Sequence, residues 1–341
     1  SGYVFVDENG EMFFALGGAV QYTYQNHATA FHNNLMPELQ PLALNDYAVA
    51  QLLASSGNNT IKVYLPPDNL TDADWVSLEN FTTNLYDTYG IRTMLVHFGG
   101  LYADGDTGRF YLAISEESDK AAVRADILEF AEHVNNLGPA VAAVQIGNEN
   151  EYYVSGASFQ LFGGNAWDTI NMSPEDYHIF MDELAGIYKS ADSTHPVFLG
   201  HGAVVDFQMP WLTAHTTNFD GIAVNLYPNW NQGRPSARVM SVDEMDAAFG
   251  ESLNLLASLN KPVIVSEFGE SSYGDLGTAG QALFMQNATE ALSRYMAGSQ
   301  GYADHPHIVV GLIVHEYFPE YWKDAEIHPS ESGLALFNPQ G

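Results

Sequence analysis

Eight short apolar runs recur along the chain, and the segments between them have the length and periodicity of helices. The runs are rich in valine, isoleucine and leucine and lack polar alternation, as expected for strands that are buried on both faces. Strands that alternate with helices favour a parallel sheet, because each parallel connection has to cross back over the sheet. The expected strands are 14–19, 60–65, 92–98, 141–147, 196–201, 220–226, 262–267 and 308–315.

Six segments between these runs have helical periodicity, and two of them begin with capping signals. Ser173 precedes Pro174, which is the pattern of an N-cap followed by proline at the first helical position. Ser241 and Glu244 have the spacing of a capping box. A shorter helix is expected at about 207–216. The six longer helices are expected at 44–55, 72–89, 119–137, 174–191, 242–259 and 277–297.

The number and spacing of these elements predict the fold class. Eight strands spread over 341 residues favour a closed barrel. A doubly wound open sheet is the alternative, but no G-x-G-x-x-G turn follows the first strand and no P-loop is present. Residues 3–14 form a further hairpin pattern around Asn9-Gly10, which we expect to cap one end of the barrel. The sequence therefore predicts an α/β protein, a (β/α)8 TIM barrel with an N-terminal β-hairpin cap, and residues 1–341 as a single catalytic domain.

The charge of the chain limits its partners. Asp and Glu number 42 against 11 Lys and Arg, which gives a formal net charge of −31. Nucleic acid and anionic membranes are disfavoured, because binding to phosphates requires clustered Lys and Arg. The acids are scattered among aromatic and branched residues, which favours a folded acidic surface over disorder. Such a surface suits a protein in high salt, where charge repulsion is screened.

Composition also narrows the chemistry, whereas the absence of cysteine leaves the compartment open. The chain has no cysteine, so disulfides, thiolate metal ligands and a cysteine nucleophile are excluded. No run of about eighteen apolar residues occurs, so no membrane-spanning helix is expected. The start at Ser1, without the layout of a signal peptide, is typical of a trimmed mature form, and we expect a secreted or periplasmic protein.

Two carboxylates stand at the ends of expected strands. Glu149 ends the fourth strand and Glu267 ends the seventh, so that in a barrel they would face each other across its mouth. Retaining hydrolysis of a glycoside requires such a pair, held about 5 to 5.5 Å apart, with one group as acid and the other as nucleophile. The pattern therefore favours a retaining glycoside hydrolase.

Other residues near strand ends are candidates for binding a sugar. Asn148 is placed to donate to a sugar hydroxyl, and Tyr227 to donate to a carboxylate nucleophile. Tryptophans among polar loop residues suit stacking against the C–H faces of sugars. The candidate substrate-binding residues are Asn148, Tyr227, Asn225, Lys62, Tyr64, His97, His201, Glu316, Tyr317, Trp322 and Trp230.

The segments around both carboxylates resemble glycoside hydrolase clan A. VQIGNENE is similar to the Asn-Glu strand of the clan, and KPVIVSEFGES is similar to its nucleophile strand. NTIKVY, DGIAVNLYP and GLIVHEYFPEYWK resemble its second, sixth and eighth strands, and the likeness is most extended to the catalytic barrel of family 2, over about residues 10–323. The resemblance implies that Glu149 is the acid/base and Glu267 the nucleophile, supported by Asn148 and Tyr227. It also gives β-1,3-glucan a slight preference as substrate.

The chain departs from the clan pattern at two named positions. Lys62 stands where many clan members have arginine, so a point charge replaces a bidentate group. Tyr317 stands where the eighth-strand motif usually has tryptophan, and Trp322 is the nearest substitute. The sandwich domains that accompany family 2 barrels are not in this sequence.

Rival sites and functions remain open at this stage. A metal hydrolase is disfavoured, because the histidines at 97, 201 and 315 are scattered over three strands without an H-x-H motif, and a serine hydrolase would need a G-x-S-x-G elbow. A transglycosylase with the same carboxylates and a carbohydrate-binding protein without turnover are the alternatives. We expect a carbohydrate partner, no metal and no cofactor. The rival acids are Glu151, Glu270, Glu316 and Glu320.

Overall fold

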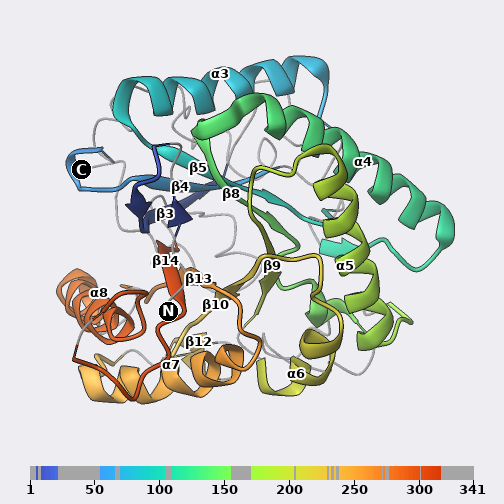
Figure 1. The fold of residues 1–341 in the computed structure, drawn as a ribbon. Coiled ribbons are helices and arrows are strands. Elements are labelled where there is room, and N and C mark those ends of the chain that lie inside the picture. Colours follow the sequence, from blue (N-terminus) through green and yellow to red (C-terminus); the bar gives the residue numbers. More distant parts are fainter. Residues whose placement is uncertain are drawn as a thin grey trace.

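The centre of the molecule is a closed barrel of eight parallel strands (Figure 1). Each lies within two residues of its expected position at both ends, and the predicted TIM barrel is confirmed. In order around the barrel, the strands are β3 (Ala15–Gln21), β4 (Thr60–Tyr64), β5 (Arg92–His97), β8 (Val141–Ile146), β9 (Val197–His201), β10 (Gly221–Asn225), β13 (Val263–Phe268) and β14 (Val309–Val314). The computed structural model describes residues 5–6, 9–21, 54–65, 70–103, 110–154, 170–202, 205–228, 230–231, 234–235, 238–270, 272, 276–299 and 301–315.

Helices surround the barrel on the outside (Figure 1). The predicted caps are present: the Ser173 side chain accepts from the backbone of Asp176, and Ser241 forms a capping box with Glu244. Most of the expected helix at 44–55 lies outside the described residues. No helix in the described ranges is long and apolar enough to cross a membrane. The helices are α3 (Asp72–Tyr89), α4 (Glu117–Leu137), α5 (Pro174–Ala191), α6 (Val205–Ala214), α7 (Val242–Ala257) and α8 (Gly277–Ser293).

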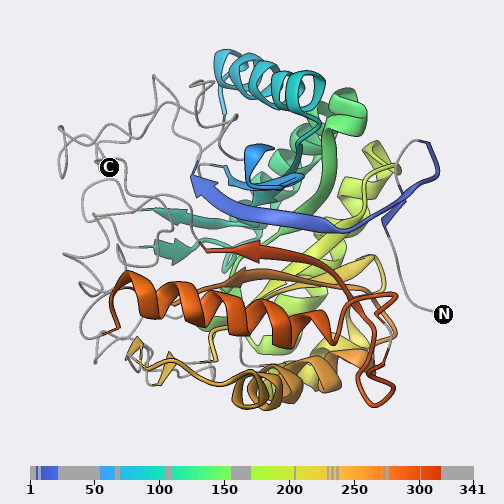
Figure 2. The same ribbon diagram turned by 90° about the vertical axis from the view of Figure 1, so that its left-hand side faces the viewer.

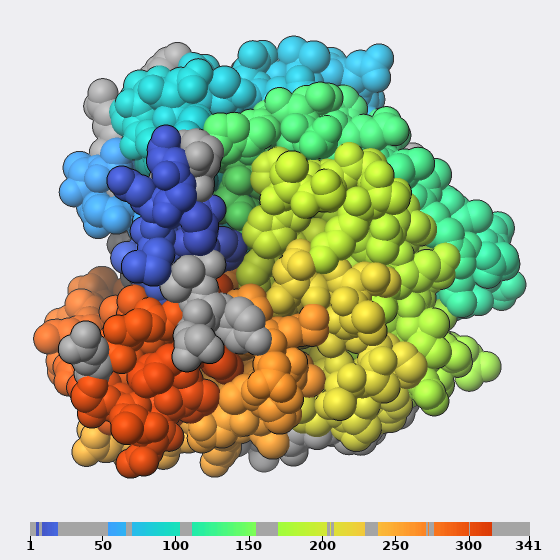
Figure 3. Space-filling view, in the orientation of Figure 1, coloured from blue at the N-terminus to red at the C-terminus, as the bar shows by residue number. Residues whose placement is uncertain are grey.

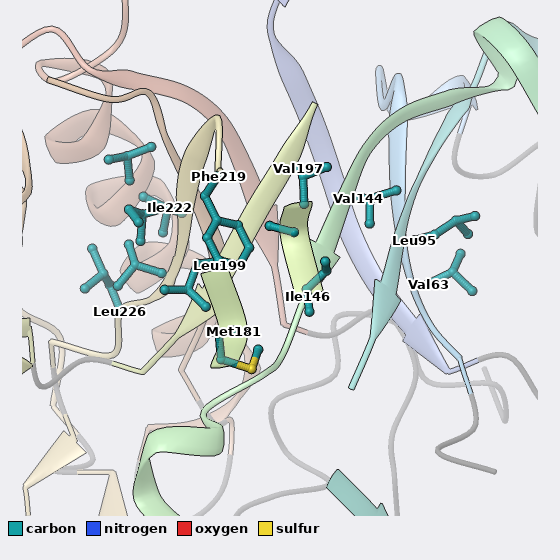
Figure 4. Close-up of a cluster of buried hydrophobic side chains, with 14 of the residues drawn as sticks. Val63, Leu95, Val144, Ile146, Met181, Val197, Leu199, Phe219, Ile222 and Leu226 are labelled. Carbon is teal, nitrogen blue, oxygen red and sulfur yellow. The ribbon is translucent and has the colours of Figure 1, made fainter. Parts of the chain in front are cut away.

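Two apolar layers form the core, because successive strand residues point to opposite faces. Val144, Ile146 and Leu199 point outward and pack with Met181 of α5 beneath the helices (Figure 4). Phe198, between two outward residues, belongs to the cluster inside the barrel. Burial of each such side chain contributes about 1.5–3 kcal/mol, so the two layers together hold the barrel and its helices in place.

The predicted N-terminal hairpin is present and covers the end of the barrel at which the strands begin. Strand β1 (Phe5–Val6) pairs with β2 (Met12–Phe13) in antiparallel fashion, and Gly10 takes a φ of 79° in the turn. The Phe5 ring lies 5.9 Å from the ring of Phe198 inside the barrel. In Figure 2 the strand arrows point away from the hairpin, and Figure 3 shows its blue surface beside the red C-terminal part of the described chain.

Several short elements were not predicted from the sequence. A two-stranded hairpin of β6 (Leu101–Ala103) and β7 (Phe110–Leu112) follows β5, and the turn η2 (Asn150–Tyr153) follows β8. A second hairpin of β11 (Trp230–Asn231) and β12 (Arg234–Pro235) follows β10. These elements lie at the carboxyl ends of their strands and line the mouth of the barrel, where this fold places its reacting groups.

Candidate active site

Glu267 lies near the carboxyl end of β13, where the strand is irregular. The register between β10 and β13 shifts between Val224 and Asn225, and the register between β13 and β14 shifts between Val265 and Phe268. Ser266 and Glu267 consequently both contact groups of the barrel interior, although neighbouring strand residues normally point to opposite faces. The irregularity therefore directs Glu267 into the mouth of the barrel.

Both carboxylate oxygens of Glu267 accept hydrogen bonds. The Nζ of Lys62 lies 3.2 Å from Oε1, and the hydroxyl of Tyr64 donates to the same oxygen. Tyr227 donates to Oε2 over 2.8 Å, and the Nδ1 of His315 lies 3.8 Å from that oxygen. Three donors from β4 and the loop after β10, and the imidazole of the residue after β14, thus surround this one carboxylate.

This environment favours the ionised form of Glu267. Burial by itself would raise the pKa of Glu267, but the charges of Lys62 and His315 and the hydrogen bonds from Tyr64 and Tyr227 outweigh it and lower the pKa. Burial also lowers the pKa of the fully buried Lys62, an effect that the neighbouring Glu267 opposes. Glu267 is therefore an ionised carboxylate in this site.

Glu149 has the opposite environment. It follows β8 at the start of η2 and is partly exposed to solvent. Among the described residues, one hydrogen bond reaches its carboxyl group, from the Nδ2 of Asn225 to Oε1 over 3.0 Å. Burial, and then the negative charge of Glu267, raise the pKa of Glu149 despite this hydrogen bond. Glu149 therefore stays protonated at pH values well above the usual pKa of a glutamate.

Two asparagines link the carboxyl groups to the sheet. Asn225 donates to Glu149 and accepts from the hydroxyl of Ser266 over 2.7 Å, so it connects the ends of β8, β10 and β13. The Oδ1 of Asn148 accepts from the Nε2 of Gln145 over 3.1 Å. No described residue accepts from the Nδ2 of Asn148.

The structure does not bring two of the predicted residues to this site. The Nε2 of His97 donates to Asp126 of α4 over 2.7 Å, and His201 lies beside Glu151 with its Nδ1 3.3 Å from Oε1. Both histidines are on the outer face of the barrel, because the residue before each, Val96 and Gly200, faces inward. The alternation of inward and outward residues along the strands therefore corrects the expectation that the two histidines contact substrate.

The remaining predicted residues fall into three groups. The first group lies around the two carboxyl groups and consists of Lys62, Tyr64, Asn148, Asn225 and Tyr227. Trp230 lies in β11, but its side chain is not described. Four predicted or rival residues lie outside the described part of the chain: Glu316, Glu320, Tyr317 and Trp322.

The structure adds site residues that sequence reasoning missed. Gln145 and Ser266 orient the two asparagines, and each is a polar residue inside an apolar strand, which was a usable signal. Tyr153 of η2 lies near Glu149, whose charge, after burial, raises the pKa of the tyrosine. Among the residues that the structure describes, no three His, Asp or Glu side chains lie close enough together to hold a metal ion.

Comparisons with known proteins place the fold. No protein-family model matches the chain, and no curated protein sequence does. Solved structures match closely in shape: the barrel is of the class found in glycoside hydrolases. The exo-β-1,4-mannosidase Op5Man5 from Opitutaceae bacterium strain TAV5 has a TM-score of 0.65 at 15% identity, covering 99% of this chain and 58% of that one.

Two further structures have the same architecture. The endo-β-1,4-mannanase from Thermotoga petrophila has a TM-score of 0.57 at 13% identity, over 98% of this chain and 75% of that one. The β-glycosidase from Pyrococcus horikoshii has a TM-score of 0.58 at 14% identity, over 94% and 88%. This chain thus spans less than two thirds of the mannosidase and most of the other two. At these identities the likeness establishes the barrel fold, and the activity has to be argued from the site.

Proposed function

We propose that the chain is a retaining β-glycoside hydrolase that cleaves β-linked poly- or oligosaccharides, with Glu149 as acid/base and Glu267 as nucleophile. The observation that carries the proposal is the contrast between two neighbouring carboxyl groups. Glu267 is held ionised by donors and positive charge, whereas Glu149 is held protonated by burial and by the charge of Glu267. Carboxyl groups whose environments push their pKa values apart can divide acid and nucleophile roles between them.

In the first step, the Glu267 carboxylate attacks the anomeric carbon of the bound sugar. Glu149 donates its proton to the glycosidic oxygen as the bond to the leaving group breaks, and a covalent glycosyl–Glu267 ester forms. Lys62, Tyr64 and Tyr227 favour the ionised nucleophile before this attack and keep its oxygens in one orientation.

In the second step, the ester loses its negative charge, so one of the two effects that raise the pKa of Glu149 disappears. Glu149, now ionised, takes a proton from water as the water attacks the anomeric carbon. The sugar leaves with its original configuration, and Glu267 is a carboxylate again. The coupling between the two carboxyl groups thus lets one residue act first as acid and then as base.

We propose a β-linked glycan as the substrate, with three candidate polymers. The resemblance of the sequence favours β-1,3-glucan, while the solved structures of similar shape include enzymes named for β-1,4-mannan and a fungal β-1,4-galactanase. A panel of these three glycans and of aryl β-glycosides covers these options. Products longer than the substrate would indicate transglycosylation by the same carboxylates.

The test is replacement of the nucleophile. Glu267→Gln should lower kcat on the best substrate by at least about a thousandfold and leave binding of the glycan intact, because the amide cannot form the ester. Glu183→Gln is the matched control: Glu183 lies on α5 and pairs with Arg124 on the surface. Proton NMR of the first product should show the β anomer. An initial α anomer, or full activity of Glu267→Gln, would refute the proposal.

A further inference from the structure

Glu149 has a backbone conformation that few non-glycine residues adopt. Its φ of 59° and ψ of 21° lie in the left-handed region, and Asn260 is the one other non-glycine residue with positive φ among those that the structure describes. The Cβ of an L-residue is crowded in this region, so such a conformation persists where the surroundings enforce it. The two residues that follow Glu149 provide that enforcement.

Asn150 ties the turn to one neighbouring strand. Its side chain is fully buried, and its Nδ2 donates to the carbonyl of Phe98, directly after β5, over 2.6 Å. Its Oδ1 accepts from the backbone amide of Asn148 over 2.9 Å. The same side chain therefore holds the residue before Glu149 and the end of β5 at fixed positions.

Glu151 ties the turn to the other neighbouring strand. It is 1% exposed, and its Oε1 accepts from the backbone amide of Gly202, directly after β9, over 2.5 Å. A Cβ at position 202 would lie 2.9 Å from that oxygen and 2.1 Å from the hydroxyl of Tyr152. Gly202 therefore has to be glycine for η2 to pack this closely against the end of β9.

Strand β8 lies between β5 and β9 in the barrel, so the two contacts fall on opposite sides of Glu149. We propose that Asn150 and Glu151 are positioning residues, which together hold residue 149 in the left-handed conformation and so direct its carboxyl group at the glycosidic oxygen. This inference rests on the proposed function for its kinetic consequence. Its structural content, the enforced backbone conformation, stands apart from any activity.

The negative charge of Glu151 adds a second effect. It is one of the charges that raise the pKa of Glu149, after burial and the charge of Glu267. Glu151→Gln keeps the size of the side chain and an acceptor for Gly202, but removes the charge. The basic limb of the kcat/KM profile should therefore move to lower pH in this variant, and a purely structural residue would not move it.

The kinetic test uses the leaving group. An activated aryl glycoside such as a dinitrophenyl glycoside departs with little help from an acid, whereas an alkyl or sugar leaving group requires protonation. Asn150→Ala and Glu151→Ala each remove the contact to one neighbouring strand, and should lower kcat/KM about ten- to a hundredfold on the unactivated substrate, and far less on the dinitrophenyl glycoside. Asn150→Asp, which keeps the acceptor for Asn148 and loses the donor to Phe98, is the conservative variant should Asn150→Ala not fold.

Asn218→Ala is the matched control. Asn218 donates through its side chain to Asp182 over 3.0 Å and lies before β10, at the opposite end of the barrel. Its loss should lower stability and change kcat/KM equally for both leaving groups. Equal losses on the two substrates for Asn150→Ala and Glu151→Ala, together with an unmoved pH profile of Glu151→Gln, would overturn the positioning role.

A crystal structure of the Asn150→Asp/Glu151→Ala variant, which removes the donor to Phe98 and the acceptor for Gly202, provides the readout without activity. We expect residue 149 to leave the left-handed region and its carboxyl group to separate from Asn225. An unchanged backbone at residue 149 would overturn the inference, whatever the enzyme does. If the unaltered chain hydrolyses no glycoside, the proposed function fails. The crystal structure of the variant still decides whether Asn150 and Glu151 enforce the conformation.

Discussion

The two ends of the barrel treat carboxyl groups in opposite ways. At the end where the strands begin, Asp192 is fully buried and accepts from Tyr188, from Thr194 and from His195. Burial alone would raise its pKa, but these hydrogen bonds hold the pKa below its usual range. At the mouth, Glu149 receives one hydrogen bond from the part of the chain that the structure describes, and its pKa is raised by a second carboxylate, Glu267.

The contrast separates an end whose network stabilises the fold from the end at which we propose the chemistry. Asp192 belongs to a network in which each donor has a buried acceptor, and such a network stabilises the fold. The mouth holds a strained backbone at Glu149, a fully buried Lys62 and a carboxyl group kept protonated, all of which cost stability. Separation of this kind is expected in a barrel whose reacting groups lie at the carboxyl ends of strands.

The largest expected effect follows from removing the Asp192 network at the amino end of the barrel. Asp192→Ala leaves Tyr188 and the 7%-exposed His195 without their shared acceptor, and should lower the free energy of unfolding by about 3–5 kcal/mol. At a temperature where the variant is folded, kcat/KM should be unchanged. Urea denaturation and a steady-state assay measure the two quantities. A variant with normal stability, or one that is stable but inactive, would contradict the division between the ends.

Replacement of one lysine at each end of the barrel tests the comparison, beginning with Lys62 at the mouth. Lys62→Met removes the cation beside Glu267, so the pKa of Glu267 should rise and the acidic limb of the kcat/KM profile should move to higher pH. The loss in kcat/KM should be about ten- to a hundredfold, roughly 1.4–2.7 kcal/mol, because a charge next to the nucleophile is removed.

Lys189→Met is the matched control for this change. Lys189 pairs with Asp220 over 2.6 Å at the amino end, and both side chains are partly exposed. Its replacement should cost at most about 1 kcal/mol of stability and leave the pH profile in place. Profiles that shift equally in the two variants would show that long-range charge, rather than the contact with Glu267, sets the acidic limb.

The elements that could be predicted from the sequence are those that a local pattern decides. Uninterrupted apolar runs located the eight strands, and Ser173 and Ser241 located two helix starts, because burial and capping act within a few residues. It also placed Glu149 and Glu267 at strand ends on the same side of the barrel. His97 and His201 were predicted to contact substrate, but they lie on the outer face of the barrel. Strand parity could have predicted this, because the residue before each of them faces inward.

Other features of the site depend on contacts that no local pattern encodes. The register shifts that turn Ser266 and Glu267 to the same side arise from pairing with β10 and β14. The contact of Glu151 with Gly202 joins residues that are far apart in the chain. From the sequence Glu151 was a rival acid, and the closure of the barrel is what makes it a buried partner of the backbone.

The smallest expected effect is a difference in the sign of the pH dependence at the two ends. Asp192 has a lowered pKa, so its stabilising contribution is present above the usual pKa of an aspartate and is lost as the pH falls. Glu149 has a raised pKa. Between about pH 4.3, the ordinary pKa of a glutamate, and its raised value, the unfolded chain releases a proton that the folded chain keeps, so stability falls as the pH rises.

Glu149→Gln removes this decline, because the amide is neutral in both states and still accepts from Asn225. The variant should be more stable than the parent at pH 7, by at least about 1 kcal/mol for a shift of one pKa unit, and the difference should disappear towards pH 4. Urea denaturation at pH 4, 5.5 and 7 measures it, with the exposed Glu183→Gln as control. A Glu149→Gln variant no more stable than the parent at pH 7 would mean that Glu149 is ionised in the folded protein, and the mouth would then lack its acid.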